Sequence, residues 1–219
     1  MFNLKVRQWR TVKRKRLVAY YYQDSKISEQ YRQVITHIKF SSKEQECRLL
    51  LITSPGFKEG KSITAINLST SMAQLEEKVL LVDADLRKPT LHDTFSLDNK
   101  LGLTTVLQGH CALNEAIHHT GLTTLDVLPS GPMPNNTARI LGSKSMRALT
   151  HYLMEQYDRI IFDTPPFLEV TDANLLANQG VGIILVVKKG KTKHEHIHET
   201  KHLIDMSEVS LLGTVLNEI

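Results

Sequence analysis

Residues 54–62 carry the chemistry of a phosphate-binding loop. The segment ends in Gly60-Lys61-Ser62, follows the apolar run 49–52 and precedes a stretch with a helical pattern. Backbone N–H groups at the start of a helix are unpaired and attract anions, and glycine lets the backbone approach them closely. Lys61 can place a positive charge on the outer phosphates, and the Ser62 hydroxyl suits magnesium. The segment therefore predicts a nucleotide-phosphate site.

The loop departs from the full motif in one place. The motif has glycine five residues before the final Gly60, where this chain has Pro55, and Gly56 follows one residue later. An ordinary strand-to-helix turn that happens to contain Gly-Lys-Ser is the alternative interpretation of this segment alone.

Acidic residues follow two further apolar runs. The run 78–82 ends at Asp83, with Asp85 two residues on, and the run 159–162 ends at Asp163. Side chains at i and i+2 of a strand point the same way. Ligands bind outside the carboxyl ends of strands in open α/β sheets. We therefore expect these carboxylates to lie together near the phosphate loop.

The order of the predicted elements indicates an α/β fold. We expect strands near residues 47–53, 78–84, 124–128, 158–163, 182–188 and 211–216. We expect helices near residues 28–40, 61–76, 112–119, 143–157, 172–178 and 193–207. This alternation predicts a P-loop NTPase-like, mostly parallel sheet with helices on both faces.

Composition agrees with one core. At 219 residues with 41% hydrophobic content, the chain can form one α/β domain, which we assign to residues 17–219. Two cysteines, Cys47 and Cys111, make no disulfide framework, which indicates a reducing compartment. No apolar run approaches the ~20 residues of a membrane span, and no apolar signal-peptide core is present at the N-terminus.

Residues 1–16 form a basic N-terminal tail. They contain seven Lys or Arg and no acid, whereas the whole chain carries a net charge of +4, so the remainder is net negative. Residues 5–16, with Trp9 among the cations, suit an anionic membrane surface at about 1 kcal/mol per cation. Nucleic acid would attract the tail as well, and a disordered solubilising tail is a third interpretation. We favour the membrane surface and expect no specific nucleic-acid partner.

The three motifs, in this order and spacing, resemble the bacterial tyrosine kinases (BY-kinases) of capsule and exopolysaccharide systems. The resemblance covers about residues 17 to 217. It extends to segments that are similar to the family's other conserved stretches, at residues 28–32, 86–92, 102–109, 128–134, 141–143 and 161–166.

The resemblance implies an ATP-dependent protein-tyrosine kinase that regulates exopolysaccharide or capsule biosynthesis. Its implied cofactors are ATP and Mg²⁺. The residues it assigns to nucleotide binding are Gly56, Phe57, Lys58, Glu59, Gly60, Lys61, Ser62, Ile63 and Asn217. Magnesium ligands would be Ser62, Asp85 and Asp163. Catalytic residues would be Lys61, Asp83, Asp85 and Arg87, with Asp83 accepting the tyrosine proton.

The resemblance also implies partners and a place in the cell. We expect a membrane-anchored activator protein, protein-tyrosine substrates, and a cytoplasmic location, peripheral at the inner face of the cell membrane. The family's helical ring-assembly pattern has Glu29 and Arg32 here, but Ile35 stands where a second arginine belongs. We therefore expect a weak or small homo-oligomer.

Two further departures bear on activity. Lys58 replaces a loop glycine, at a cost of roughly 1–2 kcal/mol if the position needs a positive φ. Residues 20–22 form a tyrosine run that reads as an extended, packed segment or as a phosphorylation site. A degenerate nucleotide-binding regulator and a partitioning-type P-loop ATPase therefore remain as alternative functions. The chain lacks the second loop lysine of the partitioning ATPases, which counts against that one.

Overall fold

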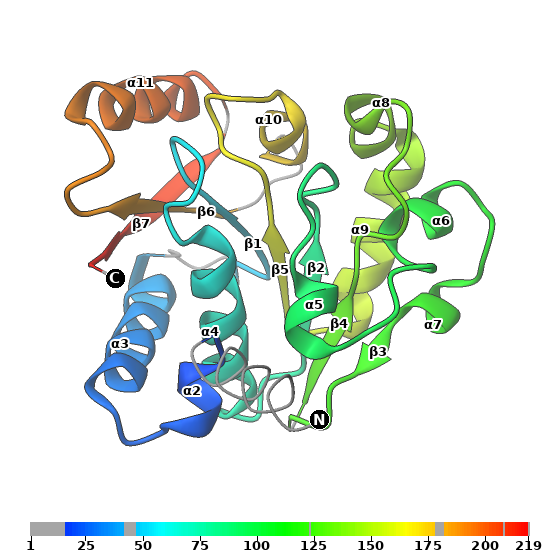
Figure 1. The fold of residues 1–219 in the computed structure, drawn as a ribbon, viewed down its shortest axis with the longest axis horizontal. Coiled ribbons are helices and arrows are strands. Elements are labelled where there is room, and N and C mark those ends of the chain that lie inside the picture. Colours follow the sequence, from blue (N-terminus) through cyan, green and yellow to red (C-terminus); the bar gives the residue numbers. More distant parts are fainter. Residues whose placement is uncertain (1–15, 42–46, 123, 178–181, 208, 219) are drawn as a thin grey trace, which may run out of the picture.

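The computed structural model describes residues 16–41, 47–122, 124–177, 182–207 and 209–218. In this part of the chain, one sheet of seven strands has the order β3-β4-β2-β5-β1-β6-β7. Neighbouring strands pair in parallel, except for the antiparallel pair β3 and β4. The sheet runs through the middle of the molecule with helices in front of it and behind it (Figure 1). The predicted fold class is confirmed.

The strands agree closely with the apolar runs. They are β1 (Leu49–Thr53), β2 (Val79–Asp83), β3 (His118–His119), β4 (Leu125–Leu128), β5 (Arg159–Asp163), β6 (Gly182–Lys188) and β7 (Ser210–Asn217). Every residue of β1 and β2 is buried. Strands covered on both faces need apolar side chains on both, which explains the continuous rather than alternating hydrophobic pattern.

The helices are mostly short, and the longer ones match the predicted helical stretches. The described helices are α2 (Val18–Tyr21), α3 (Lys26–Ser41), α4 (Lys61–Ala73), α5 (Leu91–Phe95), α6 (Leu103–Leu107), α7 (Leu113–Ala116), α8 (Thr137–Leu141), α9 (Lys144–Gln156), α10 (Asp172–Ala177) and α11 (His194–Asp205).

Two hydrophobic clusters lie on opposite faces of the sheet. Leu50 and Ile52 of β1 belong to one cluster, which includes residues of α3 and α4. Leu49 and Leu51 belong to the other, which includes residues of α9, α10 and α11. Since successive strand side chains point to opposite faces, one strand supplies both clusters. The two clusters therefore hold β1 in place from both faces, and with it the start of the loop that follows.

The predicted helix at 112–119 is wrong in its second half. Helix α7 ends at Ala116, and His118 and His119 form β3 on the antiparallel edge of the sheet. Across this pair, Nδ1 of His119 lies 2.5 Å from Oδ1 of Asp126 on β4. Pairing with β4 thus overrides the local helical pattern.

The tyrosine run is not extended. Tyr20 and Tyr21 lie in helix α2, and their rings meet edge to face with centroids 5.0 Å apart. The three tyrosines are 36%, 42% and 50% exposed, so they are only partly packed. Helix α2 is instead held through Ala19, whose N–H donates to Asn67 of α4 at 2.9 Å.

The tail prediction falls largely on residues 1–15, outside the described residues. Arg16, the last residue assigned to the tail, lies against the domain. Its guanidinium donates to Oγ1 of Thr94 at 2.9 Å, and its carbonyl accepts from Asn67 at 2.8 Å. Within the described part of the chain, no helix has the length and apolar character that crossing a membrane requires.

Candidate active site

The loop of residues 54–60 joins β1 to α4, as the sequence predicts. Gly60 has φ 102°, in the left-handed region, and precedes the first residue of α4. A Cβ on Gly60 would lie 2.1 Å from Nδ2 of Asn217, at the end of β7. Gly60 is therefore required by its backbone conformation and by the close approach of a distant strand.

Lys58 also has a left-handed backbone, with φ 59°. The condition under which a lysine is costly here, a positive φ, is therefore met. A residue with a Cβ is strained there by about 1–2 kcal/mol.

Glu59 holds the loop together from inside. It is buried, its Oε2 accepts from the N–H of Gly56 at 2.9 Å, and its Oε1 accepts from the Thr192 hydroxyl at 2.6 Å. Nearby, the Lys191 ammonium donates to the carbonyl of Phe57. The segment between β6 and α11 thus fixes the loop from a position more than 130 residues away in sequence.

The three predicted carboxylates do converge beside the loop. Asp83 and Asp163 are register partners at the ends of β2 and β5. Nζ of Lys61 lies 3.1 Å from Oδ2 of Asp85, with the two side chains 11% and 4% exposed. The lysine that would meet phosphate is therefore paired with a carboxylate in this structure.

Burial makes two of these carboxyl groups weak acids. It raises the pKa of Asp83 well above its usual range, and the neighbouring Asp163 raises it further, while the N–H groups of Leu91 and Thr90 lower it. Burial also raises the pKa of Asp163 to about 6, against the lowering effects of Lys61 and the Ser62 hydroxyl. Both groups are fully buried, so desolvation is the dominant cause.

Hydrogen bonding at these carboxylates is incomplete. Oδ2 of Asp83 accepts from the N–H groups of Thr90 and Leu91, both at 2.9 Å, and so caps the start of α5. Oδ1 of Asp83 and both oxygens of Asp163 are buried without a well-formed hydrogen bond, although the Ser62 hydroxyl is near enough to Asp163 to lower its pKa. Such atoms are costly unless a ligand satisfies them.

These acceptors fit a hard divalent cation. Magnesium takes oxygen ligands and commonly uses one or two carboxylates together with phosphates and water. No cluster of three His, Cys, Asp or Glu in the described part of the chain forms a complete metal site. A magnesium ion would therefore depend on Ser62, on water and on nucleotide phosphates as well as on Asp85 and Asp163.

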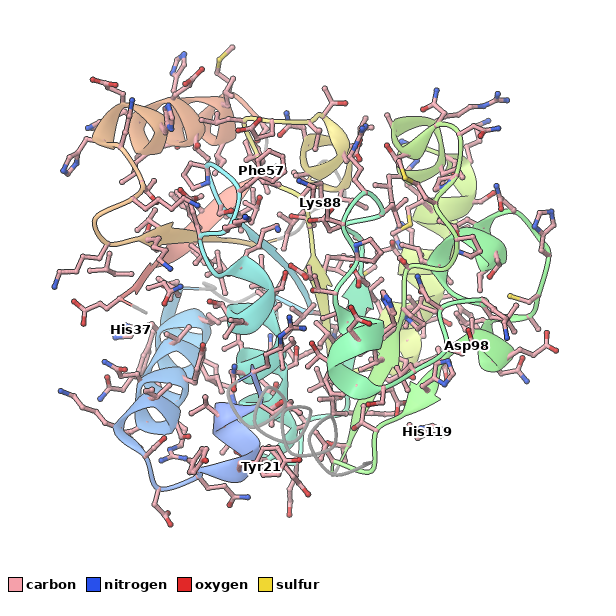
Figure 2. All side chains as sticks on the ribbon, viewed as in Figure 1. Tyr21, His37, Phe57, Lys88, Asp98 and His119 are labelled. Atoms are coloured by element: carbon pink, nitrogen blue, oxygen red, sulfur yellow. The ribbon has the colours of Figure 1, made fainter. Side chains whose placement is uncertain are left out.

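The loop borders a cavity of about 360 Å³. Its lining comes from several elements and comprises Arg16, residues 57–63, Ile66, Asp85, Lys88, Thr90, Thr94, Lys188 and Asn217. At its edge, Nζ of Lys88 lies 4.3 Å from the centroid of the Phe57 ring, which is a cation–π contact. Figure 2 shows these two side chains together, beneath α11 and α10. The cavity is strongly basic, which suits a polyphosphate.

A family comparison identifies the protein class. A model of the AAA domain family matches residues 57–205. The chain is 45% identical over 190 residues to tyrosine-protein kinase YwqD of Bacillus subtilis (strain 168), covering 87% of this chain and 80% of that protein. This chain belongs to the bacterial tyrosine kinases.

Solved structures place the kinase in the same fold. The kinase domain of the Escherichia coli tyrosine kinase ETK matches with a TM-score of 0.89 at 30% identity, covering 93% of this chain and 80% of that one. The septum site-determining protein MinD of Pyrococcus horikoshii, solved with Mg-ADP, matches with a TM-score of 0.66 at 25% identity, covering 77% and 69%. The kinase thus has a nucleotide-binding fold.

Arg87 occupies an unexpected position in the kinase. Its Nε donates to Oδ2 of the buried Asp172 at 3.1 Å, and its Nη2 donates to Oγ1 of Thr137 at 2.9 Å. It therefore ties the segment after β2 to α8 and α10. A role for Arg87 at the transferring phosphoryl group stays a prediction.

Other predicted and unpredicted residues lie around the loop. Asn217 donates to the carbonyl of Glu59 at 3.0 Å, and Ile63 is exposed at the cavity. Sequence reasoning assigned no role to Lys88 or Thr90, although both lie in a segment that resembles the family. It also missed Thr192, and no local pattern around that threonine could have revealed its contact with the loop.

Proposed function

We propose that this chain transfers the γ-phosphoryl group of ATP to tyrosine hydroxyls of proteins and so regulates exopolysaccharide or capsule biosynthesis. Membership of the bacterial tyrosine kinases supports the activity. The observation that carries it in this chain is the convergence of Lys61 and three carboxylates at one phosphate loop.

The loop would bind the phosphates of ATP. Residues 57–63, with Lys61 among them, border the cavity at the start of α4, where a helix N-terminus attracts anions, and Asn217 borders the same cavity. On phosphate binding, the Lys61 ammonium can exchange its contact with Asp85 for one with the outer phosphate oxygens. Asp85 is then free for magnesium, together with Ser62 and Asp163. Bound magnesium would neutralise charge that develops on the phosphates.

Asp83 is our candidate for accepting the tyrosine proton. A bond forms between the tyrosine oxygen and the γ-phosphorus, the bond from that phosphorus to the oxygen of ADP breaks, and the proton goes to Asp83. The unpartnered Oδ1 and the raised pKa of Asp83 both suit a base. Arg87 is a second candidate for neutralising charge, provided that it leaves Asp172.

We further propose that a membrane-anchored activator protein works with this chain. The kinase would lie at the cytoplasmic face of the cell membrane, where the basic segment 5–16 adds attraction to anionic lipid. High salt should weaken that attraction.

Incubation with γ-labelled ATP and magnesium, with and without an activator's cytoplasmic segment, tests the proposal. We expect label on tyrosine in the wild type and none in Lys61→Met, which loses the phosphate-binding cation. Free phosphate alone would indicate an ATPase instead. Nucleotide binding without turnover under both conditions would indicate a degenerate regulator.

A further inference from the structure

Lys58 is a lysine at a loop position whose left-handed backbone favours glycine. Among the described residues, the other non-glycine residues with positive φ are Glu76 at 66° and Ser96 at 58°. Both closely follow the C-terminal ends of helices, α4 and α5, where a left-handed residue is the usual stop. Lys58 instead lies before a helix, inside the phosphate loop.

Strain at such a position points to a use for the side chain. Glycine would adopt φ 59° without strain, whereas a residue with a Cβ is disfavoured there. Strained backbone tends to persist at functional sites because something there depends on it. Since the backbone alone favours glycine, the lysine side chain is the feature to explain.

Lys58 borders the cavity as an exposed cation. Within the described part of the chain it forms no ion pair, whereas Lys61 pairs with Asp85. The ammonium group of Lys88 already makes a cation–π contact with the Phe57 ring.

The adjacent acid does not neutralise Lys58 either. Both carboxylate oxygens of Glu59 point into the loop, toward the N–H of Gly56 and the hydroxyl of Thr192. The loop therefore presents one lysine that is already paired, Lys61, and one that is not, Lys58.

We propose that Lys58 is a second phosphate-binding lysine of this loop, whose ammonium binds phosphate oxygens of the nucleotide beside Lys61. The inference rests on the proposed function, because it requires that the cavity binds a nucleoside polyphosphate. On this inference, a lysine is kept at the strained position because its side chain binds the ligand, and not because it helps the chain to fold.

Four variants separate charge from backbone conformation. Lys58→Gly removes both the charge and the strain, and Lys58→Asn removes the charge while asparagine tolerates a left-handed backbone. Lys58→Arg keeps the charge. Glu76→Gly is the matched control, because it relieves a similar φ in an exposed residue that does not line the cavity.

Two measurements are needed: thermal unfolding of the nucleotide-free protein, and calorimetric titration with Mg-ATP at two salt concentrations. We expect Lys58→Gly and Glu76→Gly each to raise the Tm by about 2–4 °C. Lys58→Gly and Lys58→Asn should each weaken ATP affinity about tenfold, as expected for a charge-assisted hydrogen bond. Their ATP affinity should also depend less on salt. Lys58→Arg and Glu76→Gly should bind ATP as the wild type does.

Three outcomes would overturn the inference. Unchanged ATP affinity in both Lys58→Gly and Lys58→Asn would show that the charge is not used. If ATP affinity falls in Lys58→Gly but is unchanged in Lys58→Asn, the cause is loop flexibility and not the lost charge. If the wild type binds no nucleotide, the proposed function itself fails, and the role of Lys58 fails with it.

Discussion

Asp83 and Asp163 face each other across adjacent parallel strands, and both are completely buried. Neither has enough protein partners to compensate for the loss of water. Their charged forms therefore destabilise the fold at neutral pH, and a bound cation would relieve that cost. At the scale of single residues, the same carboxylates that would hold the cation lower the stability of the fold when no cation is bound.

The first prediction concerns Asp163→Asn. The pKa of Asp163 is raised from 3.8 to about 6 in the folded protein. The carboxyl group therefore contributes its full stability only below pH 4, and that contribution is lost as the pH rises toward 6. The asparagine variant should be more stable at pH 7, by on the order of 2 kcal/mol. It should also lose phosphoryl transfer.

Urea denaturation of the variant and the wild type in EDTA, at pH 7 and at pH 4, would measure the difference in their unfolding free energies. The difference in unfolding free energy between the variant and the wild type should disappear at pH 4. At pH 7, Mg-ATP should reduce that difference. A variant that is less stable than the wild type at pH 7 would contradict the assigned desolvation.

The second prediction concerns Asp83→Asn. The asparagine oxygen can still accept from the N–H groups of Thr90 and Leu91 and so cap α5, but it cannot take up a proton. Tyrosine phosphorylation should fall by about 100-fold or more, as for loss of a general base. A phosphotyrosine assay beside calorimetry should show unchanged ATP affinity, and the Tm should be no lower than that of the wild type because the buried charge is removed. Full activity in this variant would remove Asp83 from the mechanism.

At the scale of elements, the phosphate loop depends on the segment between β6 and α11. Thr192 accepts from the N–H of Lys188 at 2.8 Å and donates to Glu59 at 2.6 Å, so one hydroxyl connects β6 to the loop. Lys191 adds a contact to the carbonyl of Phe57. The loop's shape is therefore set from outside as well as by its own sequence.

The third prediction follows from this link. Thr192→Val keeps the side-chain shape but leaves Glu59 short of a donor, at a cost of about 1–3 kcal/mol for a buried acceptor. We expect ATP affinity to fall about tenfold, with a lower Tm. Thr36→Val is the matched control, because the Thr36 hydroxyl bonds only within the exposed face of α3. Equal effects of the two substitutions on ATP affinity, measured by calorimetry, would refute the link.

At the scale of the whole molecule, helix α3 is the element on which the expectation of a weak or small oligomer rests. Glu29 and Arg32 pair with each other at 2.8 Å, and Ile35 is buried in the core beneath α3. Position 35 therefore faces the inside of this subunit, so restoring an arginine there would bury a charge rather than create a ring contact.

The fourth prediction is that the isolated chain forms a monomer or a small oligomer. Helix α3 has two of the three residues of the ring-assembly pattern that the family resemblance implies, and those two already form a pair within the subunit. Light scattering of the chain alone, and with an activator's cytoplasmic segment, is the measurement. A stable ring of the chain alone would contradict this prediction.

The sequence by itself determined the fold class and the identity of the loop. Apolar runs such as 49–52 form strands because both faces of the sheet are covered, and that is a local property of composition. The placement of Asp83, Asp85 and Asp163 beside the loop also followed, because parallel strands end at the same edge.

Tertiary structure alone decided how these residues are used. The spacing along the chain did not show that Arg87 bonds to Asp172, that Asp83 caps α5, or that Thr192 holds Glu59. Likewise, His118 and His119 joined a strand because β4 lay next to them. Each of these outcomes depends on a partner brought near by packing of the sheet, and short-range periodicity carries no information about that partner.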